Sequence, residues 1–254
     1  MVTRPALLPD ALAARFARFV AGKPRVILGS SSSSRREIMN ELVEAFPGFV
    51  YRVVTADIDE KALRAPQPEQ LVMQLAHAKA DAILAKLESG EDSGAAAAAA
   101  ATPGETAPPS FLVTCDQVVV HEGRILEKPE TADEARAMIR GYTREAPAST
   151  VGAVVVTRLD ARGGGGGAGG ENRREAWETC VIRMDPLPEE DVEALVAEGE
   201  VMWCAGGLMV EHERVAPRVV AIEGGGDDTV RGLGRATVAK LLCDAGEVAE
   251  EEKA

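Results

Sequence analysis

The stretch ILGSSSSSRREIMNEL, residues Ile27 to Leu42, joins an apolar segment to a helix-like pattern through five serines and two arginines. Serine hydroxyls, free backbone N–H groups at a helix start and guanidinium groups all bind phosphate oxygens, so this junction is a candidate anion site. The alternative is an ordinary loop in which serines cap the helix and arginines point into water. Under both interpretations the stretch predicts a strand, a polar loop and a helix in direct succession.

Strand-like and helix-like segments alternate along the rest of the chain, with hairpin-like pairs among them. Strands are predicted at 25–28, 49–54, 111–120, 125–129, 150–159, 178–184 and 218–223, and helices at 8–20, 38–46, 68–83, 131–142, 189–198 and 236–242. This order indicates an α/β fold whose sheet is mixed rather than purely parallel, with flanking helices.

The domain organisation follows from length and composition. A chain of 254 residues with 46% hydrophobic content can bury a substantial core, so we interpret residues 1–254 as one domain. Two segments are expected to be flexible insertions: 88–110 is rich in alanine, glycine and proline, and 161–174 is rich in glycine. Residues 247–254 are expected to form an acidic tail.

Charge and cysteine content exclude several classes of protein. Twenty-eight basic and 41 acidic residues give a formal net charge of −13, which argues against a nucleic-acid partner. The four cysteines are widely spaced, as in a reduced intracellular protein. The apolar runs fall short of the roughly 20 residues that span a bilayer, and the N-terminus lacks a secretory pattern. We expect a cytoplasmic protein without a membrane partner.

Two common hydrolase motifs are missing from the sequence. The histidines, His77, His121 and His212, have neither the H-E-x-x-H pattern nor other metal-ligand spacing. The serines lack the G-x-S-x-G elbow of serine hydrolases. Zinc hydrolases and serine hydrolases are therefore disfavoured.

Charged residues within apolar segments mark a second part of the candidate site. Asp116 lies inside the apolar strand FLVTCDQVVV, where an unpaired carboxylate would be costly to bury. Lys79 lies beside the apolar face of its helix, and Lys128 follows the predicted hairpin. Glu60 ends the acidic sequence DIDE, a composition that can hold Mg²⁺. The alternatives are a solvent-facing aspartate, two surface lysines and a solvated acidic loop.

Taken together, these groups describe a nucleotide-phosphate site. The serine and arginine junction offers anion donors, the two lysines offer cations, and Glu60 and Asp116 offer carboxylates. Such a set suits in-line hydrolysis of a phosphoanhydride, in which cations neutralise developing charge and a carboxylate activates water.

Five motifs in this order resemble the Maf-like nucleoside triphosphate pyrophosphatases. They are LGSSSSSRREIM at 28–39, IDE at 58–60, LAHAKA at 75–80, CDQVVV at 115–120 and GRILEKP at 123–129. The resemblance implies an elongated, ITPase-like mixed α/β fold with a nucleotide cleft, commonly a homodimer. It also implies cleavage of a nucleoside triphosphate to the monophosphate and pyrophosphate with a divalent cation, Mg²⁺, Mn²⁺ or Co²⁺.

The same resemblance assigns roles to individual residues. It implies that Asp116 is the general base and that Glu60 and Asp116 hold the metal. The implied phosphate-binding and catalytic residues are Ser30, Ser32, Arg35, Lys79 and Lys128. The chain departs from the family pattern at Ser33, Ser34, Pro147, Trp203 and Gly234.

The expected substrate depends on which branch of the family the chain resembles. One branch has Asp-Thr and favours dTTP and UTP; the other has Asp-Gln, favours 7-methyl-GTP and carries a motif similar to WCAGGLMVE. The sequence of this chain, with Gln117 and Glu211, favours 7-methyl-GTP, and both residues are expected to contact the base. The alternatives are a dTTP/UTP pyrophosphatase and a non-catalytic nucleotide-binding regulator of cell division; for Glu211 alone the alternative is a surface charge.

Overall fold

A computed structural model of the chain describes residues 7–90, 110–159 and 172–251. Within these ranges seven strands form one mixed sheet in the order β2-β1-β3-β5-β6-β7, and β4 pairs with β3. The strands are β1 (Arg25–Leu28), β2 (Tyr51–Val53), β3 (Ser110–His121), β4 (Arg124–Leu126), β5 (Ala148–Leu159), β6 (Arg173–Met184) and β7 (Val219–Glu223). Strand β1 is parallel to β2 and β3, and the other pairs are antiparallel.

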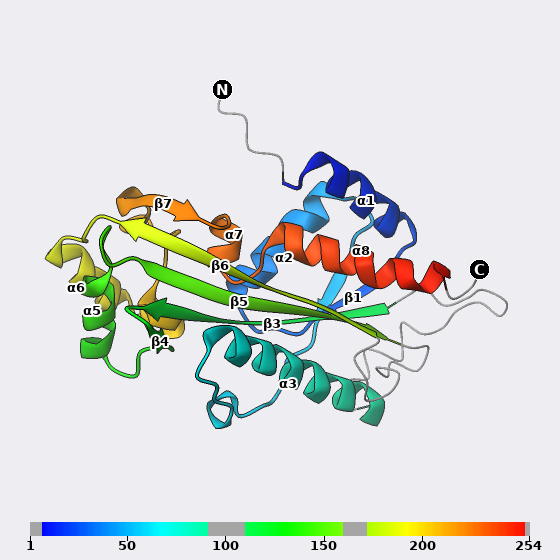
Figure 1. The fold of residues 1–254 in the computed structure, drawn as a ribbon, viewed down its shortest axis with the longest axis horizontal. Coiled ribbons are helices and arrows are strands. Elements are labelled where there is room, and N and C mark those ends of the chain that lie inside the picture. Colours follow the sequence, from blue (N-terminus) through cyan, green and yellow to red (C-terminus); the bar gives the residue numbers. More distant parts are fainter. Residues whose placement is uncertain (1–6, 91–109, 160–171, 252–254) are drawn as a thin grey trace.

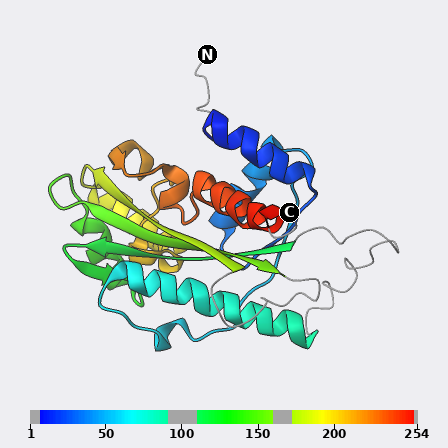
Figure 2. The same ribbon diagram turned by 45° about the vertical axis from the view of Figure 1, so that its right-hand side comes forward.

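Helices cover both faces of this sheet. The helices are α1 (Asp10–Ala21), α2 (Ser33–Ala45), α3 (Pro68–Ser89), α5 (Ala132–Gly141), α6 (Glu189–Glu198), α7 (Asp227–Val230) and α8 (Arg235–Glu251). Helix α3 lies along one face, whereas α1, α2 and α8 lie together on the opposite side (Figures 1 and 2). At the other end of the long strands, α5 and α6 pack beside β4 (Figure 1).

Separate apolar cores fill the spaces between these layers. The largest cluster packs α1, α2 and α8 against the sheet around Phe16, Phe49 and Phe111, all at most 1% exposed. A second cluster lies between α3 and the middle of β3 and β5. A third joins α5, α6 and the end of β3. The long strands β3 and β5 thus connect two packed ends of an elongated molecule.

The central feature for function is an interruption along one edge of β3. Strand β5 pairs with all of β3, but on the other side β1 pairs with residues 110–113 and β4 with residues 119–121. No other described strand pairs with residues 114–118 on that side. Asp116 is the middle residue of this interval, so the backbone edge beside it is left for side chains from other segments.

The predicted α/β fold with a mixed sheet and flanking helices is confirmed, with differences in the lengths of its elements. Strand β6 begins at Arg173 rather than 178, because its first half pairs with β5 along an exposed face that carries polar residues. Strand β2 is only three residues long at the sheet edge. No helix in the described ranges has the length and apolar character needed to cross a bilayer.

The expected insertions and tail lie largely beyond what the structure describes. Of the segments 88–110 and 161–174, residues 91–109 and 160–171 lie outside the described residues. The segment expected to be an acidic tail, 247–254, begins inside α8. There Glu247 accepts a hydrogen bond from Arg15 Nε at 2.6 Å, which joins the end of α8 to α1.

Gly29 allows the loop after β1 to pass closely between α3 and β3. Its N–H donates to the carbonyl of Val113 at 2.7 Å, which extends the β1–β3 pairing by one residue. A Cβ at this position would lie 2.6 Å from Thr114 Cγ2 and 2.7 Å from Ile83 Cδ1. A glycine is therefore required where the chain enters the serine-rich loop.

We predict that Gly29→Ala lowers the free energy of unfolding by about 1–3 kcal/mol, because the added methyl overpacks this contact. Urea unfolding would measure the loss. Gly152→Ala is the matched control, since its Cβ would meet its nearest neighbour, the Asp116 carbonyl oxygen, at an ordinary 3.6 Å. Equal stability of the two variants would contradict the prediction.

Candidate functional site

A buried ion pair between β3 and α3 forms the centre of the site. Lys79 Nζ donates to Asp116 Oδ1 at 2.5 Å, and the two residues are 8% and 7% exposed. Lys79 lies on the buried stripe of α3, one turn after Leu75 and one turn before Ile83. The sequence therefore places a lysine where an aliphatic side chain would be expected, directly opposite the one carboxylate of β3.

Glu60 joins the pair from the turn that follows β2. It begins the short 3₁₀ turn Glu60–Ala62, which Asp59 caps by accepting from Lys61 N–H. Its Oε1 lies 2.9 Å from Lys79 Nζ, so one ammonium group bridges two carboxylates. The Glu60 side chain remains 53% exposed, so this carboxylate faces the solvent side of the bridge.

Burial and neighbouring charges shift the pKa values of these three groups. Burial raises the pKa of Asp116 above its ordinary value, despite the opposing effect of Lys79 and Arg35. For Lys79, burial alone would lower the pKa, but the carboxylate of Asp116 raises it overall. For Glu60, burial acts to raise the pKa, and the hydrogen bond from Lys79 outweighs this effect and lowers it. Lys79 and Glu60 are thus held charged, whereas Asp116 is the group that takes up a proton more readily.

The serine-rich loop brings hydroxyl and guanidinium groups to the same part of the sheet. Ser32 is the N-cap of α2 and accepts from the Arg35 N–H at 3.4 Å. Ser30 is 7% exposed, and its Oγ accepts from Ser32 N–H at 3.2 Å and from Arg35 Nη1 at 3.4 Å. The helix-capping interpretation thus holds for Ser32, while Ser30 binds the Arg35 guanidinium; binding of an anion at this loop stays a prediction.

The guanidinium of Arg35 occupies the free edge of β3. Its Nη1 donates to the Cys115 carbonyl at 3.3 Å, within the interval that lacks a partner strand. Its Nε donates to the Gly232 carbonyl at 3.0 Å, from the segment that precedes α8. The Arg35 guanidinium therefore lies beside the β3 backbone at the residue before Asp116, although Arg35 and Asp116 are 81 residues apart in the sequence.

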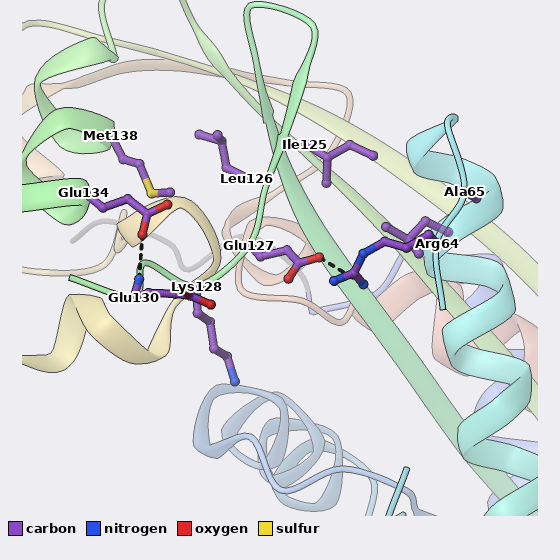
Figure 3. A pocket seen from close by; sticks show the side chains of 10 residues that line it. Arg64, Ala65, Ile125, Leu126, Glu127, Lys128, Glu130, Glu134 and Met138 are labelled. Carbon is purple, nitrogen blue, oxygen red and sulfur yellow. Dashed lines mark hydrogen bonds and ion pairs between the residues drawn. The ribbon is translucent and has the colours of Figure 1, made fainter. Parts of the chain in front are cut away.

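Lys128 reaches the site from the loop after β4. Within the described ranges Lys128 takes part in no ion pair. Its positive charge nevertheless acts to lower the pKa of Glu60 and of the Cys204 thiol. It also lines a pocket of about 380 Å³ whose apolar walls include Leu126 and Met138 (Figure 3). In this view the Lys128 side chain extends away from those apolar groups. Lys128 is thus an exposed cation at the junction of the pocket and the site.

Gln117 and Asp116 point to opposite faces of the sheet, as neighbours on a strand must. Asp116 faces α3, whereas Gln117 Nε2 donates to the Thr229 carbonyl at 2.8 Å, on the side of α7. A ligand beside the free edge of β3 could still reach both side chains, because it would lie between the two faces.

The charges of Glu211 and Lys128 both act on the thiol of Cys204. Burial raises the pKa of the Cys204 thiol to about 11, and the charge of Glu211 acts in the same direction, whereas Lys128 opposes it. Glu211 is exposed, and so is the neighbouring Trp203, at 77%. Glu211 and Lys128 thus both influence Cys204, which packs against the apolar cluster that contains α5.

The structure brings most of the predicted residues together and adds one segment. Ser30, Ser32, Arg35, Lys79 and Asp116 surround the free edge of β3, with Glu60 bound to Lys79. Sequence reasoning missed the residues before α8, whose carbonyls at Thr229 and Gly232 bind Gln117 and Arg35. The run of glycines in EGGGDDTVRGLGR was the available signal, but glycines alone do not identify their partners.

The comparisons with known proteins agree on one family. A family profile described as Maf-like protein matches residues 25–245. A 7-methyl-GTP pyrophosphatase from Dictyostelium discoideum is 30% identical over 217 residues, which cover 85% of this chain and 95% of the relative. A nucleoside triphosphate pyrophosphatase from Streptomyces coelicolor is 26% identical and covers 87% and 91% of the two chains. A dTTP/UTP pyrophosphatase from Mesorhizobium japonicum is 32% identical and covers 74% and 76%.

The buried ion pair makes a prediction about stability. Lys79→Met removes the cation and leaves the Asp116 carboxylate buried without its partner, so we expect a loss of about 3–5 kcal/mol in the free energy of unfolding. The double variant Lys79→Met/Asp116→Leu should recover most of that loss, because both charges are then replaced by apolar groups. Urea unfolding of the two variants would measure this, and a double variant less stable than the single one would contradict it.

Proposed function

Because this chain belongs to the Maf-like protein family, we propose that it is a nucleoside triphosphate pyrophosphatase that releases the nucleoside monophosphate and pyrophosphate. The observation that carries the proposal is the Asp116–Lys79 pair beside the free edge of β3, with Arg35 bound along the same edge. The pyrophosphatase activity named for its relatives supports the reaction type.

In the proposed reaction Asp116 is the general base. A water oxygen forms a bond to the α-phosphorus while one of the water protons passes to the Asp116 carboxylate. The bond between the α-phosphorus and the α–β bridging oxygen breaks, which releases pyrophosphate and leaves the monophosphate. A base works best when its pKa approaches the working pH, and burial shifts the pKa of Asp116 in that direction. Lys79 keeps enough negative charge on Asp116 for it to accept the proton.

Three cations would neutralise the charge of the phosphates. Arg35 lies on the free edge of β3, Lys79 lies between the two carboxylates, and Lys128 extends from the loop after β4. Cations aimed at the place where charge develops stabilise the transition state more than the ground state when they are held in advance. The contacts of Arg35 and Lys79 with the protein hold them in this way.

The carboxylates also fit a divalent cation delivered with the substrate. Within the described ranges, groups of three or more His, Cys, Asp or Glu side chains with metal-binding geometry are absent. Mg²⁺ is ordinarily held by one or two carboxylates together with substrate phosphates, and Glu60 and Asp116 supply that number. Mg²⁺, Mn²⁺ or Co²⁺ at these residues would supply neutralisation of phosphate charge.

The substrate we propose is 7-methyl-GTP or another modified nucleotide. Gln117 borders the site from one face, and Glu211 is an exposed carboxylate that could accept hydrogen bonds from a guanine edge. The relative from Dictyostelium discoideum supports this choice, while that from Mesorhizobium japonicum keeps dTTP and UTP as the second candidates.

We predict that Asp116→Asn lowers kcat by about a hundredfold or more, which is the usual contribution of a general base, and leaves nucleotide binding in place. Pyrophosphate release and isothermal titration with the nucleotide would measure the two effects. Asp57→Asn is the matched control, because that carboxylate is 91% exposed and pairs with Lys86. Turnover of Asp116→Asn within threefold of the unsubstituted chain would show that another group is the base.

Glu211 is expected to set base selectivity. On a panel of 7-methyl-GTP, GTP, dTTP, UTP and CTP with Mg²⁺ or Mn²⁺, we expect the fastest pyrophosphate release from 7-methyl-GTP. Glu211→Gln should lower kcat/KM for that substrate by about tenfold, the value of one charged hydrogen bond, and leave UTP unchanged. Glu213→Gln, an exposed neighbour, serves as the control.

Other outcomes of the panel separate the alternatives. Fastest release from dTTP or UTP would preserve the proposed mechanism and overturn the role of Glu211. Nucleotide binding without hydrolysis of any substrate would favour the non-catalytic regulator.

A further inference from the structure

The segment between β7 and α8 contacts the candidate site through its backbone. Residues 224–234 connect the two elements and contain the short helix α7 (Figure 1). The carbonyl of Gly232 accepts from Arg35 Nε at 3.0 Å, and the carbonyl of Thr229 accepts from Gln117 Nε2 at 2.8 Å. One segment, distant in sequence, thus binds two of the side chains that line the free edge of β3.

Gly232 lies against both Arg35 and Gln117. It is buried and has a φ of +103°, a conformation that L side chains rarely adopt. A Cβ there would lie 2.9 Å from Arg35 Nε and 3.3 Å from Gln117 Oε1. Any other residue at this position would displace the guanidinium or the amide, so the glycine sets where both groups lie.

The segment is itself anchored by buried charge. Asp228 is 9% exposed, and its Oδ2 accepts from Arg235 N–H at 2.7 Å and from Arg235 Nε at 3.0 Å. The Asp228 carbonyl also accepts from Leu233 N–H at 3.1 Å. These bonds close the turn that carries Gly232, so the position of its carbonyl is fixed before any ligand binds.

Two ion pairs tie the same segment to the helix that carries Arg35. Arg231 pairs with Glu37, and Arg235 pairs with Glu41, both on α2. Arg231 and Arg235 are 12% and 20% exposed in their side chains, so neither is a freely solvated surface charge. The backbone that receives Arg35 and the helix that presents it are therefore held together.

We propose that residues 228–235 are a positioning element and that Gly232 is the positioning residue that orients Arg35 toward the substrate phosphates. This inference rests on the proposed function, because it assigns Arg35 an anion to bind. With Nε bound to Gly232 and Nη1 bound to Ser30 and Cys115, the plane of the guanidinium is fixed. Orientation before binding reduces the ordering cost of holding a phosphate, which increases affinity without a new contact.

The element also fixes the polarity of the Gln117 amide. A carbonyl oxygen only accepts hydrogen bonds, so the Thr229 carbonyl requires the amide nitrogen of Gln117 to face it. The Gln117 oxygen then faces away from that carbonyl and offers an acceptor. The same segment therefore orients both the Arg35 guanidinium and the Gln117 amide beside the free edge of β3.

Binding of inorganic triphosphate, measured by isothermal titration, tests the proposal without requiring turnover. We expect Gly232→Ala to weaken triphosphate binding by about tenfold or more, the value of a displaced charged hydrogen bond. With a hydrolysed nucleotide, KM should rise more than kcat falls. Gly224→Ala is the matched control, because it also has a positive φ and would press on Thr179, but it does not touch Arg35 or Gln117.

A double-mutant cycle decides whether Gly232 acts through Arg35. In an Arg35→Ala background, Gly232→Ala should cause no further loss of triphosphate affinity, because the group that it orients is gone. Additive losses, an unchanged single variant, or an equal loss in Gly224→Ala would each overturn the proposal. If Gly232→Ala does not fold, Asp228→Asn, which loosens the same turn, takes its place in the cycle with the same expected result.

The outcomes also separate this inference from the proposed function. A chain that couples Gly232 to Arg35 in triphosphate binding but hydrolyses no nucleotide would overturn the enzymatic function alone. Hydrolysis without coupling would overturn the positioning role alone. If the unsubstituted chain does not bind inorganic triphosphate, Arg35 has no phosphate to orient and the inference is wrong.

Discussion

The pairing of Lys79 with Asp116 is the interaction on which the site depends. A carboxylate in the middle of an apolar strand is stable there only with a cation beside it, and α3 supplies that cation from its buried face. This pairing requires α3 to lie on the sheet with its Lys79 side chain next to Asp116. It also brings Glu60 to the site, because the same ammonium group binds both carboxylates.

The free edge of β3 explains how side chains from other segments come to lie beside this pair. If β1 or β4 were a few residues longer, the backbone from 114 to 118 would be paired and the groups around it covered. Instead, β1 ends and the chain turns through Gly29 into the serine-rich loop, which places Arg35 on that edge. Helix α2 begins at this point, so its N-terminus, the guanidinium and the carboxylate pair meet where the sheet is interrupted.

Local patterns in the sequence predicted much of this arrangement, and contacts distant in sequence account for the remainder. Asp116 was identifiable because a charge inside FLVTCDQVVV needs a partner, and Lys79 because it lies beside an apolar helix face. The positions of Gln117 and Arg35 relative to Gly232 were not predictable, because those contacts join segments more than 100 residues apart. Sequence alone also treated the serines as either caps or anion ligands, whereas Ser32 caps α2 while Ser30 binds Arg35.

The balance of charge in the site bears on how an acidic protein could bind a polyanion. The chain carries a formal charge of −13, so attraction of a nucleotide must come from local cations. Of the three cations proposed to face the phosphates, Lys79 already pairs with Asp116 and Glu60, whereas Arg35 and Lys128 have no carboxylate partner among the described residues. A triphosphate has more negative charge than these two groups can neutralise. A divalent cation bound jointly by the phosphates and the two carboxylates would correct that imbalance, which gives a physical reason for carboxylates to line a phosphate site.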